Sequence, residues 1–103
     1  MSAVDRLADV EAVLTALGDA TRRQIYEVLL DQGSATATGL APEFRISRQA
    51  VAKHLNILAA GGLATFDRVG RETVYRPAEE GLNDLVAWAA ATRSAWHRRL
   101  DRL

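Results

Sequence analysis

Residues 37–60 have the sequence ATGLAPEFRISRQAVAKHLNILAA, and the second half of this stretch carries a clear helical pattern. Val51, Leu55 and Leu58 follow one another at intervals of four and three residues, which places them on one face of a helix. Ser47 precedes this face and is a good N-cap, because its hydroxyl can accept a hydrogen bond from a backbone N–H group of the first turn. The pattern predicts a helix that begins directly after Ser47.

A shorter helix is expected before this one, between Ala37 and Phe44. Pro42 fits there only if that helix is short or begins late, because proline supplies no backbone donor. The turn Phe44-Arg45-Ile46 has the length required for two helices to cross steeply. Residues 37–60 therefore predict a helix-turn-helix.

The pattern changes after the second of these helices. Residues 63–69 and 72–76 contain Thr, Phe, Val and Tyr on either side of Gly70, which predicts two strands joined by a tight turn. A minor strand is expected near residues 34–36. A hairpin directly after a helix-turn-helix is the layout of a winged helix, in which residues 63–76 form the wing.

Helical patterns flank this central region on both sides. The first flanking helix spans about residues 4–17, and Gly18 ends it as a C′ glycine would. Asp19 caps the next helix, which ends at Gly33. The last helix spans about residues 79–102. Its apolar seam has a near-heptad spacing and is formed by Leu82, Leu85, Ala89, Thr92, Trp96 and Leu103.

The chain of 103 residues is long enough for one domain and has a modest core, so that sharing a core with a second copy is plausible. We predict a single winged helix-turn-helix domain over residues 1–103. It is mainly α with a small β-hairpin wing (α+β), in the order α-α-α-α-β-β-α. The helix-turn-helix occupies about residues 37–60.

The formal net charge is zero, because thirteen cations balance thirteen acids, but the charge is unevenly distributed. Residues 1–44 have a net charge of −4 and residues 77–103 a net charge of zero. Residues 45–76 carry six cations against two acids, a net charge of +4. The predicted second helix and wing are therefore basic. Two copies of this region in a dimer would attract the protein electrostatically to DNA.

The polar face of the second helix carries side chains suited to DNA. Gln49 and Lys53 lie opposite the apolar face, and Arg48 lies in the first turn, where the helix N-terminus favours phosphate. Arg and Gln are suited to bidentate contacts with guanine and adenine edges. Arg68 and Arg71 flank Gly70, where a wing would meet phosphates or the minor groove. Taken singly, each feature has an ordinary explanation. The helix could be an amphipathic helix with a solvent-exposed face, and the two arginines could protect an edge strand from pairing with another chain.

Three segments resemble the ArsR/SmtB family of winged helix-turn-helix repressors. They are LGDATRRQIYEVLL (17–30), SRQAVAKHLNILAAGGL (47–63) and GRETVYRP (70–77), and the resemblance extends from about Val10 to Trp96. Each segment alone is weak evidence for the resemblance, but the order and spacing of the three together make the evidence strong. The resemblance implies a homodimer, held mainly by its first and last helices, that represses transcription by binding double-stranded DNA at a palindromic operator.

With the resemblance, two sets of candidate residues can be named. The candidate DNA-binding residues are Arg45, Ser47, Arg48, Gln49, Lys53, His54, Arg68 and Arg71. The candidate dimer-interface residues are Leu7, Val10, Leu14, Leu85, Trp88, Ala89 and Trp96. The two tryptophans are assigned to the interface because aromatic side chains dominate interface cores.

Many members of the family release DNA when they bind a metal, but the known site types lack their ligands in this chain. The chain has no Cys, so the thiolate site of the third helix is absent. The last helix offers Asp84, His97 and Asp101, and a single imidazole is too few for a family-like zinc site. We therefore expect no metal and no cofactor, and assign no small-molecule inducer. His97 is expected at the dimer seam or on the surface, and the repressor could control its own gene.

Two other classes of function fit the sequence less well. A winged-helix module that binds protein and not DNA would have a neutral or acidic recognition face, which Arg48, Gln49 and Lys53 contradict. An enzyme is not expected, since the chain has no Ser/His/Asp constellation, glycine-rich phosphate loop or paired carboxylates in an apolar setting. The N-terminus lacks the apolar region of a signal peptide, and the uncharged run 85–92 is too short to span a bilayer, so the sequence predicts a cytoplasmic protein without a membrane segment.

Overall fold

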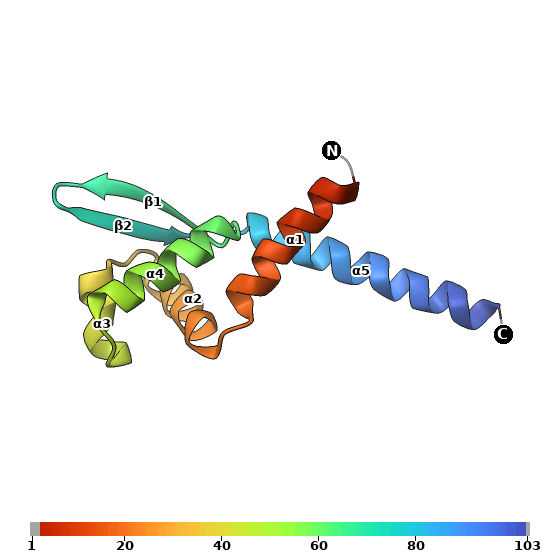
Figure 1. Ribbon diagram of the computed structural model, residues 1–103, viewed down its shortest axis with the longest axis horizontal. Coiled ribbons are helices and arrows are strands. Elements are labelled where there is room, and N and C mark those ends of the chain that lie inside the picture. Colours follow the sequence, from red (N-terminus) through yellow and green to blue (C-terminus); the bar gives the residue numbers. More distant parts are fainter. Residues whose placement is uncertain (1–2, 103) are drawn as a thin grey trace.

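The computed structural model describes residues 3–102, with side chains from Asp9 onward. Five helices and one antiparallel hairpin follow one another in the predicted order α-α-α-α-β-β-α (Figure 1). The elements are α1 (Ala3–Leu17), α2 (Ala20–Gln32), α3 (Ala37–Phe44), α4 (Arg48–Ala60), β1 (Ala64–Val69), β2 (Glu72–Pro77) and α5 (Glu80–Asp101). The predicted winged helix-turn-helix fold is therefore confirmed.

The molecule is elongated, with principal extents of 58 × 28 × 20 Å. The hairpin and α3 lie at one end, and the second half of α5 projects from the other end (Figure 1). α1 packs against both α4 and α5, so it joins the projecting helix to the helix-turn-helix. The wing and the projecting half of α5 are thus held apart by the body of the domain.

Local capping explains where α2 and α4 begin. The Ser47 hydroxyl accepts a hydrogen bond of 3.0 Å from the Ala50 N–H group and starts α4. The Asp19 carboxylate accepts a 3.0 Å bond from the Arg22 N–H group and starts α2. That bond, together with the Arg22 charge, holds the pKa of Asp19 below its usual value. Both residues therefore act as the N-caps that their positions predicted.

The helix ends follow the sequence less closely. Gly33 closes α2 in the left-handed conformation, at φ 83°, as expected. α1 ends before Gly18, but Gly18 does not have a positive φ, so it is not the left-handed C′ residue that we predicted. Arg45 takes that conformation at the end of α3, at φ 55°. Pro42 lies inside α3, where it removes one backbone donor from a helix of eight residues.

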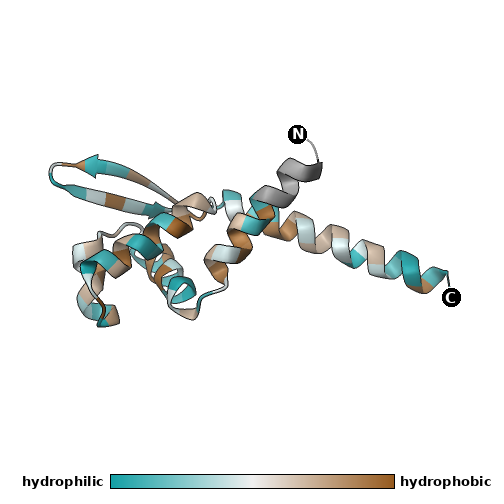
Figure 2. Cartoon of the chain, viewed as in Figure 1, coloured by the Kyte–Doolittle hydropathy of each residue, from teal (hydrophilic) through white to brown (hydrophobic). Residues whose placement is uncertain are grey.

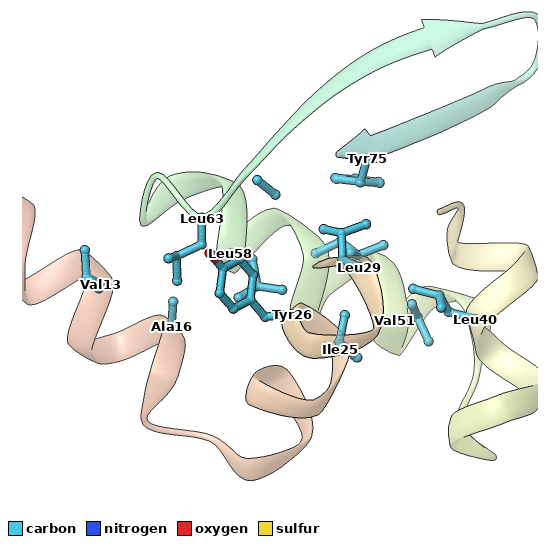
Figure 3. Packing of buried hydrophobic residues seen from close by; sticks show 12 residues of the cluster. Val13, Ala16, Ile25, Tyr26, Leu29, Leu40, Val51, Leu58, Leu63 and Tyr75 are labelled. Carbon is cyan, nitrogen blue, oxygen red and sulfur yellow. The ribbon is translucent and has the colours of Figure 1, made fainter. Parts of the chain in front are cut away.

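The core lies where α4 crosses the other helices (Figure 3). Val51, Leu55 and Leu58 are fully buried, which confirms the apolar face predicted for this helix. The core cluster is formed by Val13, Ala16, Ile25, Tyr26, Leu29, Leu40, Val51, Leu55, Leu58, Leu63, Ala64 and Tyr75. Because residues of α1, α2, α3 and the hairpin all pack on α4, its opposite face has a fixed position relative to the wing.

Arg22 joins three helices at the α1–α2 turn. Its Nε and Nη2 atoms donate to the carbonyl oxygens of Ala16 and Thr15, at 2.9 and 3.0 Å, and so cap the end of α1. Its Nη1 atom lies 3.2 Å from Nδ1 of His54 on α4. The Gly-Asp-x-Thr-Arg-Arg segment therefore has a structural role, which is to hold α1, α2 and α4 together.

The predicted interface residues fall into three groups. Leu7 lies outside the residues whose side chains are described. Val10 is 7% exposed and Leu85 is half-buried against the core, so both are largely covered within the chain itself. Leu14, Trp88, Ala89 and Trp96 are exposed.

Sequence analysis missed two apolar side chains of α5. Val86 and Leu100 are 65% and 58% exposed, and Trp96 is 61% exposed. Figure 2 shows that hydrophobic residues continue along α5 beyond the body of the domain. The projecting half of α5 therefore carries apolar side chains that the chain itself leaves uncovered.

Candidate nucleic-acid interface

An open groove of about 580 Å³ lies between the helix-turn-helix and the wing. The N-terminal residues of α3 form one side, the first half of α4 forms the floor and β2 forms the other side. The lining residues are Thr36, Ala37, Thr38, Arg48, Gln49, Ala52, Arg71, Glu72, Thr73 and Tyr75. We refer to this feature as the wing groove.

The wing groove brings together three of the predicted DNA-binding residues. Arg48 and Gln49 come from the first turn of α4, and Arg71 comes from the hairpin turn; all three are exposed. The first residues of α3 and α4 also line the groove, so the positive ends of two helix dipoles lie beside it. Arginine side chains, hydroxyl groups and helix N-termini are the groups that proteins use to hold phosphate oxygens.

Tyr75 sets the position of the wing relative to α4. Its hydroxyl donates to Oδ1 of Asn56 at 2.6 Å, and its backbone forms a bridge with Ala35 at 2.8 and 2.9 Å. Its ring contacts that of Phe66 at a centroid distance of 5.6 Å. Burial raises the pKa of the Tyr75 phenol, so the hydroxyl is protonated at neutral pH and can act as the donor. The bridge to Ala35 is the minor strand that the sequence predicted near residues 34–36.

The remaining predicted residues lie outside the lining of the wing groove. Arg45 and Lys53 are exposed, at the turn before α4 and on α4 itself. Ser47 is exposed, but its hydroxyl is engaged as the N-cap. Arg68 lies in β1 just before the hairpin turn, and its Nε donates to the Gly70 carbonyl oxygen at 3.4 Å.

His54 is not brought together with the other candidates. Its side chain is half-buried and its Nδ1 faces Arg22, at the junction of α1, α2 and α4. The structure gives His54 a packing partner within the chain, and the wing groove does not include it. We therefore leave His54 out of the proposed interface.

The polar residues that complete the wing groove were not predicted. Thr36 and Thr38 come from the start of α3, and Glu72 and Thr73 come from β2. Thr36 is also the N-cap of α3, since its hydroxyl accepts a 3.1 Å bond from the Gly39 N–H group. The alternation of side chains along a strand places Thr73 and Tyr75 on one face, a signal that could have been used.

The described part of the chain contains neither a metal-binding cluster nor a helix that could span a membrane. Among residues 9–102, no three His, Cys, Asp or Glu side chains are grouped as metal ligands would be. His97 and Asp101 are both exposed on α5. No helix within residues 3–102 has the length and the apolar character needed to cross a membrane.

Tyr75→Phe is expected to lower the free energy of unfolding by about 1 kcal/mol, because it removes one hydrogen bond while the ring and the backbone bridge stay in place. Chemical denaturation of Tyr75→Phe, Asn56→Ala and the double variant measures the coupling between the two side chains. A coupling of about 0.5–1.5 kcal/mol is expected. Strictly additive effects of the two substitutions would contradict an energetic role for the hydrogen bond that joins Tyr75 of the wing to Asn56 of α4.

A short helix, a turn, a second helix with an exposed basic first turn, and a hairpin that carries a facing arginine together define a winged helix-turn-helix protein. The sequence matches the model of a helix-turn-helix domain over residues 17–65. It is 37% identical to the HTH-type transcriptional regulator YuzN of Bacillus subtilis, over 74% of this chain and 89% of that protein. It is 36% identical to the transcriptional repressor SdpR of the same organism, over 74% and 83%.

Solved structures give the same result. An ArsR-like transcriptional regulator from Rhodococcus sp. RHA1 is 39% identical, with a TM-score of 0.78 over 92% of this chain and 89% of that chain. The homodimeric winged helix-turn-helix DNA-binding domain of a possible ArsR-family regulator from Mycobacterium bovis is 27% identical, with a TM-score of 0.69 over 91% and 88%. The chain belongs to the ArsR family of winged helix-turn-helix transcriptional regulators.

Proposed function

We propose that the chain represses transcription as a homodimer that binds a palindromic operator. The observation that carries this proposal is the wing groove, where Arg48 and Gln49 of α4 face Arg71 of the wing across an open space of about 580 Å³. A relative of similar length is a transcriptional repressor, and a structural relative is a homodimeric DNA-binding domain, which supports both parts of the proposal.

In the proposed complex, the first turn of α4 enters the major groove and the wing lies over the adjacent backbone. Gln49 contacts a base edge, since its amide can donate and accept at once. Arg48 and Arg71 bind phosphates of the strand that passes through the wing groove. Arg45, Lys53 and Arg68 are exposed around it and add to the attraction, and Ser47 keeps the first turn of α4 in place.

The proposed dimer forms through α1 and α5. Leu14 on α1 and Trp88 and Trp96 on α5 are 39%, 41% and 61% exposed, and a partner subunit would cover them. A twofold axis then relates the two copies of α4, so each copy meets one half-site. The half-sites are expected about one helical turn, roughly 34 Å, apart.

The proposal includes no metal, no cofactor and no catalytic step, and it assigns no inducer. Repression can then be set by the amount of the protein, for example at its own promoter. We place the protein in the cytoplasm, together with the DNA that it binds.

Fluorescence anisotropy with fragments of the protein's own promoter tests the proposal. Tight binding to one fragment with a steep dependence on salt is expected, because phosphate contacts release counterions. Binding that is absent or insensitive to salt on every fragment would sink the proposal. That result would favour the alternative, a winged-helix module that binds another protein and not DNA.

Two substitutions separate the proposed roles within the wing groove. Gln49→Ala is expected to lower operator affinity by about tenfold or more and to leave random-sequence affinity nearly unchanged, because a base contact is lost. Arg71→Ala is expected to weaken both and to reduce the salt slope by about one, as the loss of a phosphate contact does. The measurement is anisotropy on the two duplexes at several salt concentrations. The reverse pattern would show that the two roles are wrongly assigned.

A further inference from the structure

Glu72 is the one acidic side chain among the residues that line the wing groove. It is the first residue of β2, it pairs with Val69 across the hairpin, and it is exposed. The other acid of the wing, Asp67, forms an ion pair of 3.1 Å with Arg76. That pair is the only ion pair formed within the described side chains, so Glu72 has no cationic partner there.

An unpaired carboxylate is unusual in a surface that has to attract DNA. If a phosphate strand passes between Arg48 and Arg71, Glu72 lies beside it, and like charges at short range repel. The carboxylate therefore opposes the binding of every duplex. It also cannot bind phosphate by hydrogen bonding, because an ionised carboxylate only accepts.

A DNA duplex offers one kind of partner whose hydrogen bond to the carboxylate can offset its repulsion from the phosphates. The exocyclic amino groups of the bases are donors, and the minor groove beside the wing presents one of them, N2 of guanine. Glu72 directly follows Arg71 at the hairpin turn, in the part of the wing that would meet phosphates or the minor groove. At a sequence that presents such an amino group, the repulsion is offset by a charge-assisted hydrogen bond.

We propose that Glu72 is a specificity-determining residue of the wing groove. It weakens binding to DNA in general, and it accepts a hydrogen bond from an exocyclic base amino group, guanine N2 foremost, at the operator. The proposal rests on the proposed function, since it requires that the groove bind DNA. It assigns discrimination between sequences to a wing residue as well as to α4.

The test compares Glu72→Gln with wild type on an operator duplex, selected from a random pool by the wild-type protein, and on random-sequence duplex. Glu72→Gln removes the charge and nearly keeps the shape. Its affinity for random duplex is expected to rise by about threefold to tenfold, since one repulsive charge leaves the phosphate strand. Operator affinity is expected to rise less or to fall, so the ratio of the two affinities falls by at least about fivefold.

Two further variants separate charge from contact. Glu72→Asp keeps the charge but shortens the side chain, so it is expected to bind random duplex as wild type does and to lose operator affinity. Glu27→Gln makes the same change of charge on the exposed surface of α2, outside the groove, and is expected to leave the ratio of the two affinities unchanged.

Equal gains on both duplexes for Glu72→Gln, as for any change of net charge, would overturn the inference and leave the proposed function standing. An unchanged base preference in duplexes selected by Glu72→Gln would overturn it as well. If wild type binds neither duplex, the proposed function fails first, and this inference fails with it.

Discussion

Replacing Trp96 with Ala is expected to raise the dissociation constant of the dimer by about thirtyfold or more, because a central aromatic side chain contributes about 2 kcal/mol or more to an interface. Trp96 is 61% exposed on the projecting half of α5, and no contact of the core cluster depends on it. The variant should therefore fold as wild type does and show the change only in its oligomeric state. Sedimentation velocity over a range of protein concentrations measures it.

The loss of the dimer is expected to carry over to DNA. Two linked copies of α4 bind two half-sites with an affinity that exceeds that of one copy by about a hundredfold or more. At concentrations where Trp96→Ala is monomeric, its operator affinity should be about a hundredfold or more below that of the wild-type dimer. Leu30→Ala is the matched control, since Leu30 is 53% exposed on α2, which is not one of the two helices of the proposed interface. A Trp96→Ala protein that sediments as wild type at low concentration would refute the proposed interface.

The helix-turn-helix was predictable from the sequence because its signals are local. Ser47 must precede α4 to satisfy its first N–H groups, and the apolar face of α4 repeats at the helical period. Gly18 was misjudged because the rule for left-handed glycines ignores other ways to end a helix. Here the Arg22 guanidinium donates to the carbonyl oxygens of Thr15 and Ala16, so α1 ends without a left-handed residue.

The wing groove was only partly predictable, because it depends on which side chains of the hairpin face α4. Arg48, Gln49 and Arg71 were found by their chemistry, one element at a time. Glu72 was counted only as one of the two acids of residues 45–76, and the hydrogen bond of Asn56 was not predicted. The missing information was the 2.6 Å bond from Tyr75 to Asn56, a long-range contact that spacing does not encode.

An apolar stripe looks the same in the sequence whether its side chains are buried within one chain or between two chains. Val10 belongs to an apolar stripe, and so does Trp96, yet Val10 is 7% exposed and Trp96 is 61% exposed. Only the position of α1 across the first half of α5 distinguishes them. Val86 and Leu100 each follow a seam residue by four positions, Leu82 and Trp96, so they lie beside the near-heptad seam and the seam pattern omitted them.

Replacing Gly81 with Ala is expected to destabilise the fold, although Gly→Ala in an open helix stabilises by about 1 kcal/mol. Gly81 is buried in the first turn of α5, where its N–H group donates to the Gly62 carbonyl oxygen at 2.8 Å. A methyl group at Gly81 would overlap the carbonyl oxygen of Gly61, a backbone atom that cannot turn aside. α5 must then move away from the end of α4.

Overpacking of this kind costs about 1–3 kcal/mol, and it would move the temperature of unfolding down by about 10 °C in a domain of this size. Asn83→Ala is the control, because Asn83 is exposed two residues further along the same helix and its backbone bond to Glu79 does not involve the side chain. If the close approach of α4 and α5 limits this position, calorimetry is expected to show changes of opposite sign in the unfolding temperatures of the two variants. A Gly81→Ala protein that melts at or above wild type would show that the two helices can separate without cost.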